Sequence, residues 1–570
     1  MIFIRRIRQN PSYLKGEKST ALDLARGRLM IVLGCFIVAY LLLALRAVDL
    51  TVLQAQAIIP DLRVADRTME SPERKNIMRA DIMDRNGVML ATTLKTASLF
   101  ADSRFIAEPK KTAKALKKIF PDLKYGETLQ KLQSGKSFIW LKRNITPHEQ
   151  KRVLEIGEPG LAFEKSTKRF YPQEGLAGHL LGYTNIDNNG LYGVERSFDA
   201  YLSKYDDPLR LSVDVRFQHA LHREVLAAKE EFKALGAAGV IMDVNTGEIL
   251  AGISLPDFNP HNASRASENE SFSRLTQGAY ELGSVFKIFS TAAFLENSNL
   301  PMSTTFDARE PIKIGGFRIN DFHAQKRVLT IPEVFMHSSN IGTAMMAQAV
   351  GGDALQKFYT DLGLLDPMQF EIKEVARPQI PNPWREISTL TASYGHGVTT
   401  TPLQIASAVS TTINGGTLVK PKLVLSDEPD NSPEIRVLSE ATSHKMRQLM
   451  RIVVSEGTGS KAAVKGYKVG GKTGTAEKII NGRYDDDKKI SSFVGVFPMD
   501  APKYVVYIMV DEPIGHKGTW GYATGGWVAA PAVARTIASI AAIEGIMPYD
   551  EGEQDFASSL KQYIAVEEGR

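Results

Sequence analysis

The sequence predicts an α+β protein whose main domain is an antiparallel sheet flanked by helices, behind an elongated N-terminal domain and one transmembrane helix. Three observations support this fold class. Residues 29–45 carry no charge, residues from about 55 to 205 are charged and mixed, and apolar runs typical of strands occur at both ends of the region that follows. A chain of 570 residues is long enough for two or three domains with their own cores.

The first predicted element is a membrane anchor. The uncharged run LMIVLGCFIVAYLLLAL starts at Leu29 and, continued helically to Val48, approaches the ~20 residues that span a bilayer. The residues before it are rich in Lys and Arg, so the positive-inside rule keeps residues 1–28 in the cytoplasm and exports the rest. A cleaved signal peptide is the alternative, but the run is longer than a usual signal and no small-x-small site follows it. We therefore expect a cytoplasmic tail at 1–28 and a transmembrane helix at 29–48.

Composition excludes several kinds of site. Lys and Arg number 69 against 64 Asp and Glu, and the net charge of +5 is spread along the chain, so we expect no nucleic-acid partner. The single cysteine, Cys35, lies in the apolar run and permits neither a disulfide nor a Cys-based zinc site within the chain. The spacing of His219 and His222 is better explained by a solvated helix face than by a metal. No metal site is predicted.

Residues 49–205 are predicted to form the elongated N-terminal domain. Short strand-like runs alternate with turn signals, and a Lys-rich helical stretch occurs around 109–119. The dipeptide Asn86-Gly87 stands between MRADIM and VMLATT and predicts a β-hairpin.

Residues 206–548 are predicted to form the main domain. A strand and an amphipathic helix (LRLSVDVRFQHALHREVLAAKEEF) precede two β-runs around the turn at 245–247, and the runs ISSFVGVF and YVVYIMVDEP return near the end. An antiparallel sheet built from both ends of this region, with helices on both sides, accounts for the pattern. We expect a closing helix after Pro531. The polar stretch at 549–570 is expected to be a surface helix or a frayed tail.

The pattern Ser-x-x-Lys suggests a serine nucleophile. It occurs at Ser12–Lys15, Ser284–Lys287 and Ser558–Lys561. The first copy lies in the cytoplasmic tail and the third in the polar C-terminus, which leaves Ser284. On a helix that starts after Gly283, the hydroxyl and the Lys287 amine share a face near the positive end of the helix dipole. Lysine can act as the base if burial and nearby cations lower its pKa. An N-cap serine with an unrelated lysine is the alternative.

Two further clusters make a catalytic interpretation more specific. The polar island His337-Ser338-Ser339-Asn340 lies between two apolar segments, where a hydroxyl and an amide could relay a proton and hold a carbonyl. The segment KVGGKTGTAEK contains Lys472-Thr473-Gly474-Thr475 and suggests an edge strand, with Gly474 allowing close approach of substrate. A plain surface strand would explain the second cluster alone, but not all three motifs together.

In this order and approximate spacing, the three motifs resemble those of the penicilloyl serine transferases. The segments RADIMDRNGVMLA, RFYP and GLYGVE resemble the pedestal motifs of class B penicillin-binding proteins, with Ala80 where glycine is usual. Other segments, MDVNTGEILAGISLPDFNP, ASYGHGVTTTPLQ and GGWVAAP, resemble recurrent parts of that class's catalytic domain. The resemblance extends over residues ~79 to ~535 and implies the penicilloyl serine transferase fold for 206–548 and a pedestal for 49–205.

The resemblance implies a peptidoglycan D,D-transpeptidase that acts on stem pentapeptides, is inhibited by β-lactams and needs no cofactor. Ser284 would be the nucleophile, Lys287 would deprotonate it, and Ser338 and Asn340 would sit across the cleft. Lys472, Thr473 and Thr475 would bind the terminal carboxylate, and the backbone N–H groups of Ser284 and Thr475 would form the oxyanion hole. A β-lactamase-like acylase, a non-catalytic division scaffold and a penicillin-binding sensor are the alternatives.

The segments SSNIGTAMM and GKTGTAEK resemble the division-type enzymes of the FtsI group, whereas elongation-type enzymes typically have Ser-x-Asp and often Lys-Ser-Gly. Membership of this group implies a single-pass protein of the bacterial inner membrane, with its catalytic domain in the periplasm at the division septum. It also implies an FtsW-like glycosyltransferase and other division proteins as partners, with Gly34 and Ala39 as candidates for close helix packing. An elongation-type enzyme is the alternative.

Overall fold

The computed structural model describes residues 17–48, 78–426, 433–480, 482–549 and 555–565. The chain divides into two units, Met1–Lys75 and Asn76–Arg570, which are described separately. The first contains the helix α1 (Glu17–Val48), which begins earlier than the predicted anchor at 29–48. Its side chains from Arg28 to Ala44 are exposed, as lipid-facing side chains would be.

By length and composition alone, one helix of the described residues could cross a membrane, and it is α18 (Gly525–Glu544). Half of that window is buried within the protein, because α18 packs on the main sheet. The apolar part of α1, Arg28–Ala44, is shorter than this test requires. The membrane anchor at 29–48 therefore stays a prediction.

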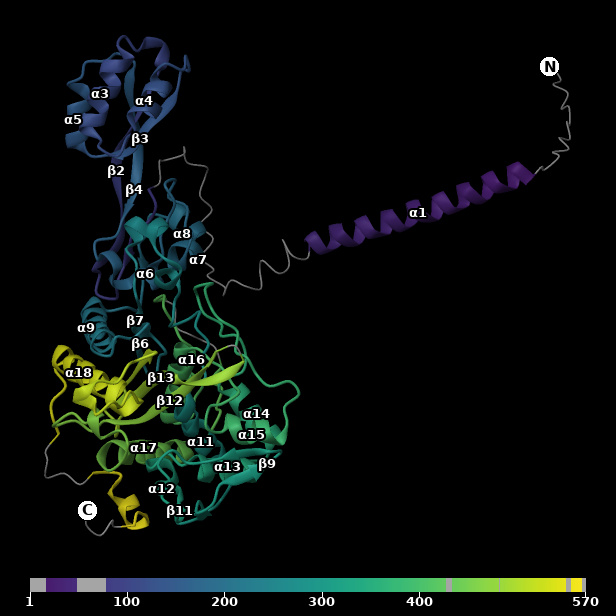
Figure 1. The fold of residues 1–570 in the computed structure, drawn as a ribbon, viewed down its shortest axis with the longest axis vertical. Coiled ribbons are helices and arrows are strands. Elements are labelled where there is room, and N and C mark those ends of the chain that lie inside the picture. The colour runs from purple at the N-terminus through teal and green to yellow at the C-terminus, as the bar shows by residue number, and fades with distance from the viewer. Residues whose placement is uncertain (1–16, 49–77, 427–432, 481, 550–554, 566–570) are drawn as a thin grey trace, which may run out of the picture. The chain divides into compact units, whose positions relative to one another are not determined.

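The pedestal is built around the long strand β2 (Figure 1). Its elements are β1 (Ile82–Met83), β2 (Met89–Ala101), α3 (Pro109–Ile119), α4 (Tyr125–Leu132), β3 (Ile139–Ile145), α5 (Pro147–Leu154), β4 (Leu161–Phe170), α6 (Gly178–Leu181), α7 (Gly193–Ser197), α8 (Asp199–Lys204) and β5 (Leu209–Arg210). The hairpin predicted at Asn86-Gly87 is confirmed, since β1 and β2 pair antiparallel around it. Asp84 Oδ1 accepts hydrogen bonds from the backbone N–H groups of Asn86 and Val88, both at 2.8 Å, which fixes the turn.

A buried ionic cluster joins the three segments that resemble pedestal motifs. The Nε atoms of Arg79 and Arg169 each lie 2.7 Å from one oxygen of Glu195, whose side chain is fully buried. Arg79 Nη1 also lies 2.7 Å from Asp199, and Arg169 Nη1 donates to the carbonyl oxygen of Ala80 at 2.7 Å. The carboxylate of Glu195 compensates the desolvation of both guanidinium groups, so its loss would break the buried ion pair of Arg169 and leave Arg79 with Asp199.

The main sheet has the order β12-β13-β14-β6-β7 and is antiparallel throughout, as predicted. Its strands are β6 (Gly236–Asp243), β7 (Ile249–Leu255), β12 (Gly470–Ile480), β13 (Arg483–Phe497) and β14 (Tyr504–Asp511). Strands from the two ends of the domain meet where Tyr504 of β14 pairs with Asp243 of β6. The Lys472 segment lies on β12, which is the edge strand that the sequence predicted.

Helices cover both faces of this sheet (Figure 1). Ala237 and Ile241 of β6 pack with α9 (Val215–Glu231) and α18, whereas the alternating Val240 and Met242 pack in the core with the other helices. Those helices are α11 (Lys287–Asn297), α12 (Ile331–Met336), α13 (Asn340–Val350), α14 (Gly352–Asp361), α15 (Glu386–Ala392), α16 (Pro402–Ile413) and α17 (Glu440–Ser455). Two small pairs of strands, β8 (Thr305–Asp307) with β11 (Val328–Thr330) and β9 (Ile312–Ile314) with β10 (Phe317–Ile319), complete the domain.

Of two expectations near the C-terminus, the start of the closing helix is wrong and the surface helix is confirmed. The closing helix α18 begins at Gly525 and contains Pro531, because its buried apolar side chains pack on the sheet and outweigh one lost helical hydrogen bond. For the polar stretch, expected to be a surface helix or a frayed tail, the structure shows a helix where it is described: η8 (Ser558–Tyr563) is a 3₁₀ helix that buries Leu560 against the core. Residues 550–554 and 566–570 of the predicted tail lie outside the described residues.

Candidate active site

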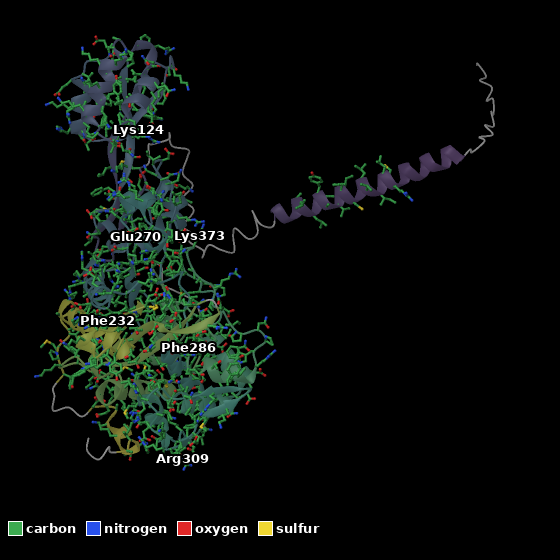
Figure 2. The ribbon with its side chains drawn as sticks, in the orientation of Figure 1. Lys124, Phe232, Glu270, Phe286, Arg309 and Lys373 are labelled. Atoms are coloured by element: carbon green, nitrogen blue, oxygen red, sulfur yellow. The ribbon has the colours of Figure 1, made fainter. Side chains whose placement is uncertain are left out.

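Ser284 lies on a tight turn that is pressed against β12. The turn is η5 (Gly283–Phe286), and the α-helix itself starts only at Lys287, one turn later than the sequence predicted. Gly283 has φ +57, and a Cβ there would lie 2.4 Å from the carbonyl oxygen of Thr475. Figure 2 labels Phe286, the fully buried last residue of the turn. Glycine at 283 therefore allows the nucleophile candidate and the Lys-Thr-Gly strand to approach closely.

Gly474 serves the same approach from the strand side. A Cβ at this position would lie 2.7 Å from Val285 Cγ2, 2.8 Å from the carbonyl oxygen of Leu282 and 2.4 Å from Ser492 Oγ. Any larger residue would push β12 away from the turn, so packing requires glycine at this position.

Ser338 is held at the end of α12 in a left-handed backbone conformation, with φ +59. The turn around it is closed by backbone hydrogen bonds from His337 to the carbonyl of Glu333 and from Ser339 to the carbonyl of Val334, both at 2.9 Å. Ser339 then caps α13 by accepting from Gly342 N at 3.0 Å. A non-glycine residue in this conformation is strained, which is common at functional sites.

Two buried lysines converge on Ser338. Lys287 Nζ donates to the Ser338 carbonyl at 2.5 Å and to its hydroxyl at 3.1 Å. Lys472 Nζ donates to the same hydroxyl at 2.8 Å. Both lysines are 0% exposed, and Ser338 is half-buried. Since both ammonium or amine groups use lone pairs of Ser338 Oγ, its own proton is available for donation into the cleft.

Burial changes the protonation of both amines. The pKa of Lys287 is lowered well below its ordinary value, first by desolvation and then by the positive charge of Lys472, while Asp321 opposes this shift. Burial lowers the pKa of Lys472 to about 7. The surroundings of Lys287 therefore favour the neutral amine, which a general base requires, while Lys472 titrates close to neutrality.

The other predicted site residues, Asn340, Thr473 and Thr475, each make a hydrogen bond of their own. Asn340 donates from Nδ2 to the carbonyl of Asn320 at 2.8 Å, which fixes the orientation of its amide. The hydroxyls of Thr473 and Thr458 lie 3.2 Å apart, and Thr475 Oγ1 accepts from Gly525 N at 3.0 Å. Both threonines of β12 are half-buried. The predicted positions thus come together around the edge of β12, although the two hydrogen bonds of Lys287 go to Ser338 and not to Ser284.

Sequence reasoning missed Asp321 as part of this site. Its carboxylate accepts from Ser339 Oγ at 2.7 Å and from Ile341 N at 2.9 Å, so it anchors the segment that carries Ser338 and Asn340. No local pattern pointed to it, because it lies outside the motif on a separate loop. His396, in the segment ASYGHGVTTTPLQ, also lies near the site: burial and the charge of Lys287 lower its pKa to about 4. Within the described ranges, no cluster of three or more His, Cys, Asp or Glu side chains could hold a metal ion.

Comparison with known proteins identifies the family. A family model described as the penicillin binding protein transpeptidase domain matches residues 237–538, and one described as the penicillin-binding protein dimerisation domain matches residues 74–206. The chain is 41% identical over 482 residues to the probable peptidoglycan D,D-transpeptidase FtsI of Caulobacter vibrioides, covering 82% of each chain. The chain belongs to the class B penicillin-binding proteins. As a member of this class it is a peptidoglycan D,D-transpeptidase, a serine acyltransferase.

Other relatives are less similar in sequence. The chain is 29% identical to the peptidoglycan D,D-transpeptidase FtsI of Escherichia coli, covering 86% of this chain and 88% of that one. It is 32% identical to the stage V sporulation protein D of Bacillus subtilis, covering 80% and 76%. Among solved structures, penicillin binding protein 3 from Mycobacterium tuberculosis, complexed with ampicillin, matches with a TM-score of 0.68 at 24% identity, covering 84% of this chain and 98% of that chain. This likeness supports the penicilloyl serine transferase fold.

Proposed function

We propose that the protein cross-links the stem peptides of septal peptidoglycan during bacterial division, through an acyl-enzyme on Ser284. The observation that carries the proposal is the convergence of Lys287 and Lys472 on Ser338, beside a turn that presents Ser284 against β12. The pKa of buried Lys287 is also lowered well below its ordinary value, and shifts of this kind cluster at functional sites.

In the first step, Ser284 Oγ attacks the carbonyl of the penultimate D-Ala of a stem pentapeptide. Lys287, as the neutral amine, takes the hydroxyl proton as the C–O bond forms. The bond to the terminal D-Ala then breaks, and its nitrogen receives a proton through Ser338, which Lys287 replenishes. The products are free D-alanine and an ester between Ser284 and the remaining stem.

The oxyanion of the tetrahedral intermediate would be stabilised by the backbone N–H groups of Ser284 and Thr475. The contact between Gly283 and the Thr475 carbonyl supports this assignment, because it keeps the two backbone segments adjacent. Lys472, Thr473 and Thr475 would bind the terminal carboxylate of the donor, and Asn340 would hold a donor carbonyl. Because β12 is an edge strand, an extended peptide could pair with it, and Gly474 would allow its close approach.

In the second step, an amine of a neighbouring stem attacks the ester. The new amide bond forms, the bond to Ser284 Oγ breaks, and the proton lost by the amine returns to the serine along the same path. Because the leaving D-Ala has diffused away, the reaction proceeds towards the cross-link. β-Lactams would acylate the same serine.

The cellular assignment rests on the N-terminal helix and the relatives. We propose that residues 29–48 anchor the protein in the inner membrane, with the catalytic domain in the periplasm at the septum. The exposed side chains of α1 from Arg28 to Ala44 support contact with lipid or with another helix. A glycosyltransferase of the FtsW type and other division proteins would be the partners, and Gly34 and Ala39 would permit close helix packing.

The test is labelling of the purified full-length protein with a fluorescent penicillin. We expect Ser284→Ala to abolish labelling while the melting temperature stays near that of the wild type, since the change removes a hydroxyl and little packing. Ser12→Ala, in another Ser-x-x-Lys pattern, is the matched control and should label normally. Equal labelling of Ser284→Ala would overturn the nucleophile assignment and direct attention to Ser338. Rapid hydrolysis of the bound penicillin would instead identify a β-lactamase.

A further inference from the structure

The described C-terminal residues Asp555–Ala565, here named the C-terminal strap, pack on the outside of the transpeptidase domain. Ala557 and Leu560 are each 3% exposed and belong to the same core cluster as α12 and α17. Phe556, Tyr563 and Ile564 are partly buried against that cluster. The strap is therefore folded onto the domain along its length, despite its polar composition.

One end of the strap holds the start of α12. The hydroxyl of Thr330, the N-cap of α12, donates to the carbonyl of Tyr563 at 2.7 Å. The backbone N–H of Ala565 donates to Glu333 Oε1 at 2.8 Å. Glu333 is 3% exposed, and its other oxygen completes the capping box with Thr330. The first turn of α12 thus depends on the strap for two of its polar contacts.

The last turn of α12 carries Ser338. The backbone carbonyls of Glu333 and Val334 accept the hydrogen bonds that close the turn at His337 and Ser339. Because α12 is only six residues long, from Ile331 to Met336, a shift at its first turn is passed directly to this turn. The six residues of α12 therefore connect the strap to Ser338, whose hydroxyl accepts hydrogen bonds from Lys287 and Lys472.

The other end of the strap is connected to β12. Arg451 of α17 forms an ion pair with Asp555, with Nε 2.6 Å from Oδ2. The same guanidinium donates from Nη1 to the carbonyl of Val469 at 2.8 Å. Val469 immediately precedes β12, which carries Lys472. Asp555 therefore fixes the guanidinium that holds the entry to the Lys-Thr-Gly strand.

We propose that the C-terminal strap is a positioning element of the transpeptidase site, which holds α12 and the entry of β12 so that Ser338 and Lys472 keep their 2.8 Å hydrogen bond. The inference rests on the proposed function, because it takes Ser338 and Lys472 as catalytic. Its residues contact no reacting group. They act by fixing the distance between α12 and β12. A small displacement of either element would reduce the rate of the chemical step more than it would weaken substrate binding.

The test uses two point variants of the full-length protein, each aimed at one connection. Asp555→Ala removes the partner of Arg451, and Ala565→Pro removes the N–H that binds Glu333. The matched controls are Asp555→Glu, which keeps the carboxylate, Ala565→Ser, which keeps the N–H, and Lys561→Ala, which breaks the ion pair of the strap with Glu456 and neither connection. Stopped-flow acylation with penicillin separates the acylation rate constant from the dissociation constant of the first complex.

We expect each variant to lower the acylation rate constant by about three- to thirtyfold, with the dissociation constant changed less than about twofold. Asp555→Glu, Ala565→Ser and Lys561→Ala should stay near the wild type. Melting temperatures and the fraction of protein that is finally labelled report folding. A reduced labelled fraction whose acylation rate constant equals that of the wild type would overturn the proposal in favour of a merely structural role. Wild-type rate constants in the double variant Asp555→Ala/Ala565→Pro would also overturn it.

These outcomes are distinct from failure of the proposed function. If the wild-type protein is not labelled at Ser284, the catalytic assignment itself fails, and the strap inference falls with it. If the wild type is labelled at Ser284 and both connection variants acylate at the wild-type rate constant, only the strap inference fails.

Discussion

Lys287 and Lys472 donate hydrogen bonds to one hydroxyl oxygen, Ser338 Oγ, at 3.1 and 2.8 Å. Two ammonium groups that both contact the same hydroxyl in a buried site repel each other, so the neutral form of at least one amine is favoured. The proximity of the two lysines therefore favours a neutral amine that can act as a base.

Replacing Lys287 by arginine should nearly abolish acylation. The guanidinium keeps a positive charge near Ser338 but cannot give up a proton near neutral pH. We expect the rate constant of penicillin acylation to fall by roughly 10²–10⁴-fold, the usual contribution of a general base. Lys478→Arg is the control, because Lys478 pairs with Asp511 and Glu512 and only its charge is needed. A wild-type rate in Lys287→Arg would mean that Lys287 acts only as a fixed charge.

The lowered pKa of Lys472 should appear in the pH dependence of stability. This pKa is about 7 in the folded protein against an ordinary value of 10.5, so between these values the unfolded chain binds more protons at this position. Stability from this group therefore rises as the pH rises. Between pH 7 and pH 9 we expect the wild type to gain stability relative to Lys472→Met, measured by urea unfolding. Parallel changes in both proteins would show that Lys472 has an ordinary pKa.

Alanine at position 283 should impair the site by contact as well as by backbone strain. Gly283 has φ +57, which costs an L-residue about 1–2 kcal/mol, and its Cβ would also meet the Thr475 carbonyl. Gly315 has φ +54 with nothing within 4 Å, so Gly315→Ala isolates the strain. We expect Gly283→Ala to acylate at least about tenfold more slowly than Gly315→Ala. Equal rates in the two variants would show that the approach of the turn to β12 does not matter.

Depletion of the protein should separate division from elongation. If the enzyme cross-links septal wall, cells lacking it should become long or branched while lateral growth continues. Complementation with Ser284→Ala should fail to restore division, and complementation with the wild type should restore it. Rounded cells that still divide would place the enzyme in elongation and leave the transpeptidase activity unaffected.

The sequence predicted much of this site because the relevant residues lie in short motifs. Ser284, Ser338 and Lys472 are far apart in the chain, yet each carries its own local pattern, and the Gly-rich segment KVGGKTGTAEK predicted an edge strand for Lys472. Asp321 carried no such pattern, since its role depends on a contact with Ser339 that only the fold creates.

The expected start of the closing helix was wrong because tertiary packing overrode a local signal. Pro531 normally marks a helix start, but the apolar surface of α18 continues on both sides of it. The polar stretch around Ser558 was expected to be a surface helix or a frayed tail; it forms the helix η8, and Ala557 and Leu560 pack in the core. Neither outcome can be inferred from a window of sequence, because the surface that receives each segment comes from elsewhere in the chain.

The pairing of β14 with β6 also determines how much of the chain must be synthesised before the active site can form. Asp243 of β6 pairs with Tyr504 of β14, so β6 and β7 are synthesised long before the three strands that complete the sheet. Until then, the segment with Ser284 has no β12 to lie against and no Lys472. We therefore expect a nascent or truncated chain without residues 470–511 not to react with penicillin, and the onset of labelling to report that these strands have joined β6 and β7.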